Sequence, residues 1–195
     1  MQEIEIKFRV HDRAALQNAA SKAGLVEITP RTLEQNTLYD TSERRLRQGG
    51  QLLRLRHYGD KWLLTHKRKL TAAEDAARSG PHKVREETES EVEIGEAVEH
   101  VFLALGLKAV FRYEKFRTEY SDGTGHLTLD DTPIGEYAEL EGPPAWIDRT
   151  AQALGIPELD YLQQSYGELF LMWKRETGSP AENMTFAEVT VVESR

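Results

Sequence analysis

The sequence predicts an α+β fold in which about eight antiparallel strands form a closed barrel or a strongly curved sheet, with a charged interior and helices packed outside. Two observations support this. Several segments alternate charged and apolar residues, and short turn signals such as Asp122-Gly123-Thr124-Gly125 separate neighbouring strands. The chain has 195 residues, a length typical of one domain. We expect this domain to span residues 1–178, followed by a C-terminal tail over 179–195 that is an edge strand or disordered.

The first strand, residues 3–9, sets the pattern for the chain. Strand side chains point alternately to opposite faces. One face therefore carries the apolar residues Ile4, Ile6 and Phe8, and the other carries Glu3, Glu5, Lys7 and Arg9. Taken alone, such a charged face is better explained as a solvated surface with ion pairs between strands.

Later strands repeat this alternation with charged residues of the same kinds. The residues that share a face are Arg54 and Arg56; Thr65, Lys67 and Lys69; Arg85, Glu87, Glu89, Glu91 and Glu93; Lys115 and Arg117; and Glu139 and Glu141. Like charges at i and i+2 repel each other, so they are a poor choice for stability alone. If the faces converge, they build a cavity whose carboxylates suit a hard divalent metal and whose cations suit phosphate oxygens. We expect Arg85, Glu87 and Glu89 inside, and the end of that strand in water.

Turn and cap residues divide the rest of the chain. Asp12 is an expected helix N-cap, and Gly24 an expected left-handed C-cap. The expected strands span residues 3–9, 33–40, 52–57, 62–69, 83–94, 111–120, 126–131 and 136–141, and the expected helices 13–23, 95–105, 146–154 and 166–176. Residues 71–81 are an expected mobile connection, and 184–192 a candidate edge strand. The apolar strand faces need cover, which helices outside the sheet can provide.

Composition excludes several classes of function. There is no cysteine, so there is no disulfide, thiolate metal site or cysteine nucleophile. The net charge of −8 argues against a nucleic-acid surface, and no apolar run is long enough to span a membrane. The charged N-terminus is unlike a signal peptide, so we expect a cytoplasmic protein. Histidine metal motifs, a Walker loop and a Gly-x-Ser-x-Gly turn are all missing from the sequence.

In order along the chain, these motifs resemble those of the CYTH family, the triphosphate tunnel metalloenzymes, which includes class IV adenylyl cyclases, thiamine triphosphatases and inorganic triphosphatases. The resemblance covers about residues 2–175. The motifs that carry it are Glu3-x-Glu5-x-Lys7, Tyr39-Asp40, Leu53-Arg54-Leu55-Arg56, the Leu-Thr-His-Lys that ends at Lys67, Arg85-Glu86-Glu87-Thr88-Glu89, Lys115-x-Arg117, Leu129-Asp130, Glu139-Leu140-Glu141 and Ser165-Tyr166. The family fold is an eight-stranded antiparallel closed β-barrel, the triphosphate tunnel, in agreement with the alternation described above.

The resemblance implies roles for individual residues. The carboxylates that would handle Mg²⁺ or Mn²⁺ are Glu3, Glu5, Asp130, Glu139 and Glu141. The cations that would bind the triphosphate are Lys7, Arg54, Arg56, Lys67, Arg85, Lys115 and Arg117. The residues that would serve catalysis are Glu3, Glu5, Lys7, Lys67 and Arg117. Glu87 and Glu89 match interior carboxylates to which we assign no task.

The resemblance implies a metal-dependent enzyme that acts on ATP, tripolyphosphate or thiamine triphosphate. Length and motif order favour a class IV adenylyl cyclase-like lyase that converts ATP to cyclic AMP and pyrophosphate. The alternatives are a hydrolase that cleaves inorganic, nucleoside or thiamine triphosphate, and a polyphosphate-binding module without catalysis. Neither nucleic acid nor a membrane is an expected partner, and homodimer formation is left open.

Overall fold

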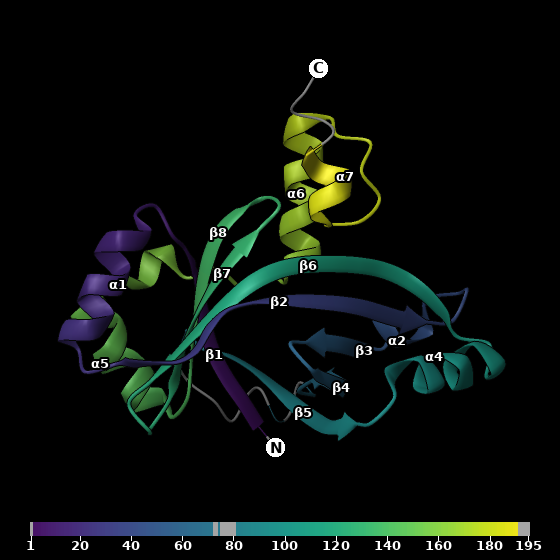
Figure 1. Cartoon of the computed structure of the whole chain (residues 1–195), viewed down its shortest axis with the longest axis horizontal. Helices are drawn as coiled ribbons and strands as arrows, with labels where there is room; N and C mark the ends of the chain where they lie inside the picture. The colour runs from purple at the N-terminus through teal and green to yellow at the C-terminus, as the bar shows by residue number, and fades with distance from the viewer. Residues whose placement is uncertain (1, 72–73, 75–80, 191–195) are drawn as a thin grey trace.

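The eight strands form a closed antiparallel barrel in the order β1-β5-β4-β3-β2-β6-β7-β8, as the sequence predicts. The computed structural model describes residues 2–71, 74 and 81–190 (Figure 1). Most of the expected connection at 71–81 lies outside these residues. The strands are β1 (Gln2–Arg9), β2 (Val26–Asp40), β3 (Gln51–Tyr58), β4 (Lys61–Lys69), β5 (Lys83–Val92), β6 (Lys108–Ser121), β7 (His126–Thr132) and β8 (Gly135–Glu141).

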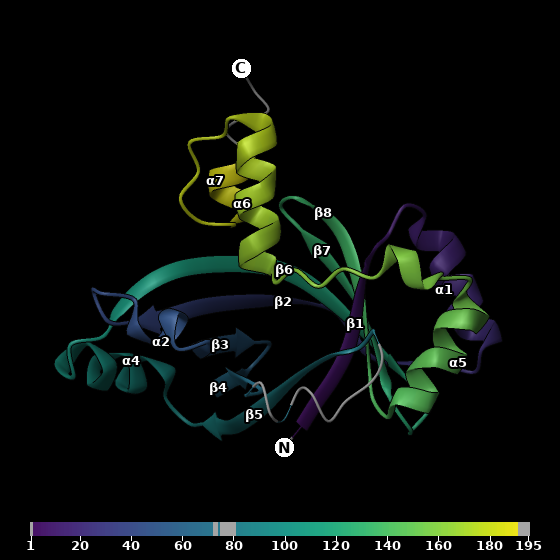
Figure 2. The same cartoon turned by 180° about the vertical axis from the view of Figure 1, so that it is seen from behind.

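The apolar face of β1 points outward into a hydrophobic core, and its charged face points into the barrel. Helices α1 (Arg13–Lys22) and α5 (Pro144–Leu154) lie side by side and cover this part of the barrel (Figures 1 and 2). Their buried side chains pack against the outer faces of β1, β7 and β8, in a cluster that includes Ile6, Phe8, Leu16, Ala20, Leu127, Leu129, Leu140, Trp146 and Ile147. Burial of these side chains outside the barrel leaves its interior to the charged residues.

Local capping accounts for where α1 begins and ends. The Asp12 carboxylate accepts a hydrogen bond from the backbone N–H of Ala15, as an N-cap does. After Ala23, Gly24 adopts a φ of +85°, and the backbone N–H of Leu25 donates to the Ala20 carbonyl. This hydrogen bond is typical of a glycine-terminated helix, so the expected caps are confirmed.

Helices α2 (Arg45–Gln48) and α4 (Gly95–Ala104) lie at the opposite end of the molecule from α1 and α5 (Figure 1). The Asp40 carboxylate begins α2 by accepting from the backbone N–H groups of Leu46 and Arg47, at 2.9 and 3.0 Å. Tyr39 holds α4 through a 2.8 Å hydrogen bond to Glu99. No helix among the described residues has the length and hydrophobicity needed to cross a membrane.

Strand β2 begins seven residues earlier than expected, at Val26. This extension contains Pro30, and proline cannot donate to a sheet ladder. The structure accommodates Pro30 with irregular pairing: β2 shifts register against β6 between Glu27 and Thr29, and again between Thr29 and Thr32. Proline in a strand is usually found at such bulges or at edges.

The C-terminal segment differs from the expected edge strand. Helix α6 (Tyr166–Thr177) stands above β6, and α7 (Phe186–Thr190) packs beside it (Figures 1 and 2). Met184 makes only an isolated parallel bridge to Tyr113, so the prediction of a strand over 184–192 is wrong for residues 186–190. The sequence Thr185-Phe-Ala-Glu188 is a helix-start signal, and Thr185 Oγ1 accepts from the backbone N–H of Glu188.

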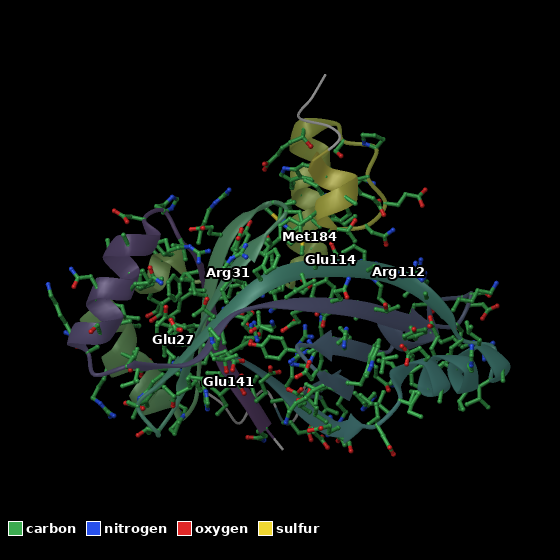
Figure 3. The ribbon with its side chains drawn as sticks, in the orientation of Figure 1. Glu27, Arg31, Arg112, Glu114, Glu141 and Met184 are labelled. Carbon is green, nitrogen blue, oxygen red and sulfur yellow. The ribbon has the colours of Figure 1, made fainter. Side chains whose placement is uncertain are left out.

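This segment is held to the barrel by backbone hydrogen bonds and by burial. Met184 is fully buried, and its carbonyl accepts from the N–H of Glu114 on β6 at 2.9 Å. Figure 3 shows both residues where the segment meets β6. Residues 179–190 are therefore structured and form part of the cover over this strand.

Candidate active site

The charged faces of the strands converge on one cavity of about 1080 Å³. Eleven of the twelve predicted site residues line it: Glu3, Glu5, Lys7, Arg54, Arg56, Lys67, Arg85, Lys115, Arg117, Glu139 and Glu141. Glu87 and Glu89 line it as well, whereas Glu91 is exposed and pairs with Lys61 outside. The interior expected from residue alternation is therefore present.

Lysines neutralise the carboxylates of β1. Lys67 Nζ lies 2.6 Å from Glu3 Oε1 and 2.9 Å from Glu87 Oε2, and Lys83 Nζ lies 2.5 Å from Glu5 Oε1. Among the described residues, no three carboxylate or histidine side chains are placed so that they could hold a metal ion as they stand. For a metal ion to bind here, the carboxylate side chains would have to rearrange.

Glu141 has no ion pair to a described residue. It lies opposite Glu5 in the β1–β8 ladder, at the exposed end of β8, and Figure 3 shows it beside β1. Desolvation and then the nearby charge of Glu3 raise the pKa of Glu141 to about 7, with smaller contributions from Glu5 and Glu139. The carboxylates of Glu3, Glu5 and Glu141 therefore crowd one wall of the cavity, and a divalent cation would reduce the repulsion between them.

Arg54 is buried and fixed by several acceptors. Its Nη1 donates to Tyr113 Oη at 3.2 Å, and its Nη2 to Thr65 Oγ1 at 3.1 Å and Glu89 Oε2 at 3.4 Å. Thr65 also donates to Glu89 at 2.6 Å. Burial alone would raise the pKa of Glu89, but the Thr65 hydrogen bond and the neighbouring arginines lower it.

Asp130 differs from the other predicted metal-handling carboxylates. It is fully buried and accepts from Lys115 Nζ at 2.8 Å, from Arg117 Nε and Nη2 at 2.7 Å each, and from Tyr166 Oη at 2.5 Å. Four donors thus occupy its two oxygens. This arrangement makes Asp130 the anchor of two cations, rather than a carboxylate open to a metal.

Glu139 joins Lys7 to the same network. It lies 3.1 Å from Lys7 Nζ and 2.8 Å from Arg117 Nη2. Burial alone would lower the pKa of Lys7, but Glu139 and Glu5 more than offset it and raise that pKa. Lys7 Nζ also lies 4.1 Å from the centre of the Tyr166 ring, so the first residue of α6 contacts a predicted substrate-binding cation.

Arg56 and Arg85 are the least engaged of the predicted cations. Arg56 reaches a carboxylate only at 3.8 Å, at Glu34, and its buried Nε has no hydrogen-bond partner among the described residues. Arg85 forms no ion pair with a described carboxylate, although it lines the cavity. Both guanidinium groups are suited to an anionic ligand.

The sequence analysis missed Glu34, which is fully buried on β2. It lies 3.4 Å from Lys115 and 3.8 Å from both Arg56 and Arg117. Burial alone would raise the pKa of Glu34, but Arg56, Lys115 and Arg117 hold it well below its usual range. The signal was available, because Glu34 and Asn36 share a strand face, but Leu38 on the same face concealed it.

The CYTH domain model matches residues 1–166, and the chain therefore belongs to the CYTH family. The match ends at Tyr166, whose hydroxyl closes the Asp130 network. No curated protein sequence matches the chain.

Solved structures of low sequence identity share the fold. A Vibrio parahaemolyticus protein provisionally assigned as an adenylate cyclase is 22% identical, with a TM-score of 0.73 over 87% of this chain and 97% of that one. A Pyrococcus horikoshii protein is 23% identical, with a TM-score of 0.68 over 86% and 98%. A Hippeastrum protein provisionally assigned as an adenylyl cyclase, and described as having a dominant triphosphatase activity, is 19% identical, with a TM-score of 0.58 over 87% and 95%.

Proposed function

We propose that this protein is a metal-dependent enzyme that cleaves a triphosphate compound inside its barrel. One observation carries the proposal: a single cavity has crowded carboxylates on one wall and a poorly engaged guanidinium on another. Glu3, Glu5 and Glu141 supply the carboxylates from β1 and β8, and Arg56 supplies the guanidinium from β3. A triphosphate with its metal ion matches both walls.

The carboxylates fit a divalent metal. All the donors are oxygens, as Mg²⁺ and Mn²⁺ prefer. Burial and then the charge of Glu3 raise the pKa of Glu141, and a bound cation would offset that charge. Glu3, Glu5 and Glu141 would hold the ion, with Glu139 within the same cluster. When bound, such an ion neutralises phosphate charge and acts as a Lewis acid.

The cations of the chain would bind and orient the phosphate groups. Arg54 and Arg56 present guanidinium groups from one strand. Lys83 would become available for phosphate if a metal ion were held by its partner Glu5, whereas Lys67 would keep Glu87 as a partner. Asp130 and Glu139 hold Lys7, Lys115 and Arg117 in place before substrate arrives. Fixed cations of this kind stabilise the charge that develops on the leaving oxygen.

Two reactions are compatible with this arrangement. Attack by a ribose 3′-hydroxyl on the α-phosphorus of ATP gives cyclic AMP and pyrophosphate, the reaction that motif order favours. Attack by water gives hydrolysis and releases orthophosphate. A module that only binds anions is less well supported, because crowded carboxylates beside its ligand would weaken binding.

The test is to incubate purified protein with Mn²⁺ or Mg²⁺ and with ATP, tripolyphosphate or thiamine triphosphate in turn. Cyclic AMP with pyrophosphate identifies a cyclase, and orthophosphate identifies a hydrolase. Tight tripolyphosphate binding without turnover would identify a binding module. Neither turnover nor binding with any of the three compounds would refute the proposal.

A further inference from the structure

Tyr166, the first residue of α6, lines the cavity, although the proposed function gives it no task. Its side chain is buried, at 7% exposure for the residue. The Ser165 hydroxyl accepts from the backbone N–H of Glu168, and the Glu168 carboxylate accepts from the backbone N–H of Ser165. This capping box fixes where α6 begins, and it therefore fixes the position of the tyrosine that follows Ser165.

The ring of Tyr166 faces two of the cations that would bind the triphosphate. Lys7 Nζ lies 4.1 Å from the centre of this ring, and Lys115 Nζ lies 4.9 Å from it. Both lysine side chains are only 3% exposed. Contacts between a cation and an aromatic face are stronger when water is excluded. The ring therefore favours one position for each ammonium group.

The hydroxyl of Tyr166 holds the carboxylate that pairs with Lys115. It donates to Asp130 Oδ2 at 2.5 Å, and Lys115 Nζ donates to the same oxygen at 2.8 Å. Burial and then the charge of Asp130 raise the pKa of Tyr166 well above its ordinary value. The hydroxyl therefore keeps its proton at neutral pH and acts as a donor, not as a base.

A second tyrosine extends this support to a third cation. Tyr113 on β6 stacks on Tyr166, with 6.1 Å between the ring centres. The Tyr113 hydroxyl accepts from Arg54 Nη1 at 3.2 Å. Lys7, Arg54 and Lys115 come from three different strands, β1, β3 and β6. The stacked tyrosines are thus a common support for cations that local sequence does not bring together.

A ring and a carboxylate hold a cation in different ways. A carboxylate neutralises an ammonium group and competes with phosphate for it, as Glu139 does for Lys7 at 3.1 Å. A neutral ring attracts the ammonium group through its quadrupole and adds no negative charge. The ring of Tyr166 can therefore hold both lysines and leave their charge available to an anionic ligand.

We propose that Tyr166 is a positioning residue, which holds the ammonium groups of Lys7 and Lys115 in place for the phosphate groups of a bound triphosphate. The inference rests on the proposed function, in which this cavity binds a triphosphate. Tyr166 acts through the two lysines and does not itself take part in bond making or breaking. Cations that are fixed before the substrate binds need no reorganisation when charge develops on the phosphate oxygens.

The test separates the ring, the hydroxyl and simple packing. Tyr166→Phe keeps the ring and removes the hydroxyl, whereas Tyr166→Leu removes both. Pentafluorophenylalanine at position 166 keeps the ring shape but removes its negative face, so it remains informative if Tyr166→Leu does not fold. Leu169→Ala is the packing control: Leu169 is buried in the same hydrophobic cluster, one turn along α6, and is not among the described residues that line the cavity.

Two quantities are measured for each protein, with its melting temperature as a check of folding. Calorimetry without metal gives the Kd for tripolyphosphate, and turnover of tripolyphosphate or ATP with Mn²⁺ gives kcat/KM. For Tyr166→Leu and the pentafluorophenylalanine variant, we expect the Kd to rise and kcat/KM to fall by about 10-fold, as loss of a buried cation–π contact implies. Tyr166→Phe should stay within about threefold of the wild type, because the ring remains. Leu169→Ala should lower the melting temperature but keep both quantities within about threefold.

Wild-type values in both Tyr166→Leu and the pentafluorophenylalanine variant would overturn the inference. A loss in Tyr166→Phe as large as that in Tyr166→Leu would also overturn it, because the ring would then not be the support. An equal loss in Leu169→Ala would reduce Tyr166 to a packing role. A wild-type protein that neither binds nor cleaves a triphosphate refutes the proposed function, whereas one that does so without dependence on Tyr166 refutes only the inference.

Discussion

Asp130→Asn tests whether the buried network around Asp130 fixes the predicted triphosphate-binding cations. Asp130 is fully buried and receives hydrogen bonds from Lys115, Arg117 and Tyr166. Asparagine keeps the shape but removes the charge, and it leaves two buried cations with less compensation. Breaking a buried ion pair by removal of one partner costs about 3–5 kcal/mol.

That cost is large for a protein of this size. For domains of 150–250 residues, 1 kcal/mol shifts the melting temperature by about 2–4 °C, so we expect a decrease of roughly 6–20 °C. Urea unfolding with linear extrapolation should give a fall of about 3–5 kcal/mol in the free energy of unfolding, with an unchanged m-value.

The neighbouring residue provides a matched control. Asp131 has the opposite orientation on β7 and pairs outside the barrel with Arg31 at 2.6 Å, where both side chains are partly exposed. Exposed ion pairs contribute about 0–1 kcal/mol, so Asp131→Asn should change the free energy of unfolding by no more than that. If the two variants lose equal stability, the buried network does not have the role that we assign to it.

Two further predictions concern pH and packing. The folded state raises the pKa of Glu141 to about 7 from its ordinary value of 4.5, so the folded protein binds this proton more tightly than the unfolded protein does. The metal-free protein should therefore lose stability as pH rises from about 4.5 to 7. Melting curves of the wild type and Glu141→Gln check this, and an identical pH dependence in the two proteins would contradict it. In Gly125→Ala, the added Cβ would lie 2.5 Å from buried Trp146, which should cost about 1–3 kcal/mol, whereas Gly167→Ala, with its nearest neighbour at 3.7 Å, should be neutral or stabilising. Urea unfolding compares these variants, and equal stability of both would refute the packing argument.

The parts of the fold that the sequence could predict are those set by local periodicity. The alternation of Ile4, Ile6 and Phe8 with Glu3, Glu5 and Lys7 in β1, together with its repetition in later strands, indicated that the charged face enters the barrel. The closed topology required the family resemblance, because alternation alone is equally compatible with a strongly curved sheet.

Contacts between distant residues could not be read in the same way. The pairing of Lys67 with Glu3 joins residues 64 positions apart, and Tyr166 reaches Asp130 across 36 positions. Glu34 was missed because a leucine shares its face, so the polar alternation is interrupted. The C-terminal helix was missed because Thr185 and Glu188, a local signal, were read as part of a strand.

The most direct test of the central claim is the Glu5→Gln variant, which keeps the side-chain shape and removes one carboxylate charge from the cavity. Melting temperatures with and without Mn²⁺ and triphosphate turnover are measured for this variant and for the wild type. If Glu5 holds the metal, the Mn²⁺-induced rise in melting temperature should shrink, and turnover should fall by several orders of magnitude while the fold survives. If Glu5 only pairs with Lys83, which lies 2.5 Å away, both quantities should match the wild type, and that result would contradict the assignment of this cavity as a metal-dependent active site.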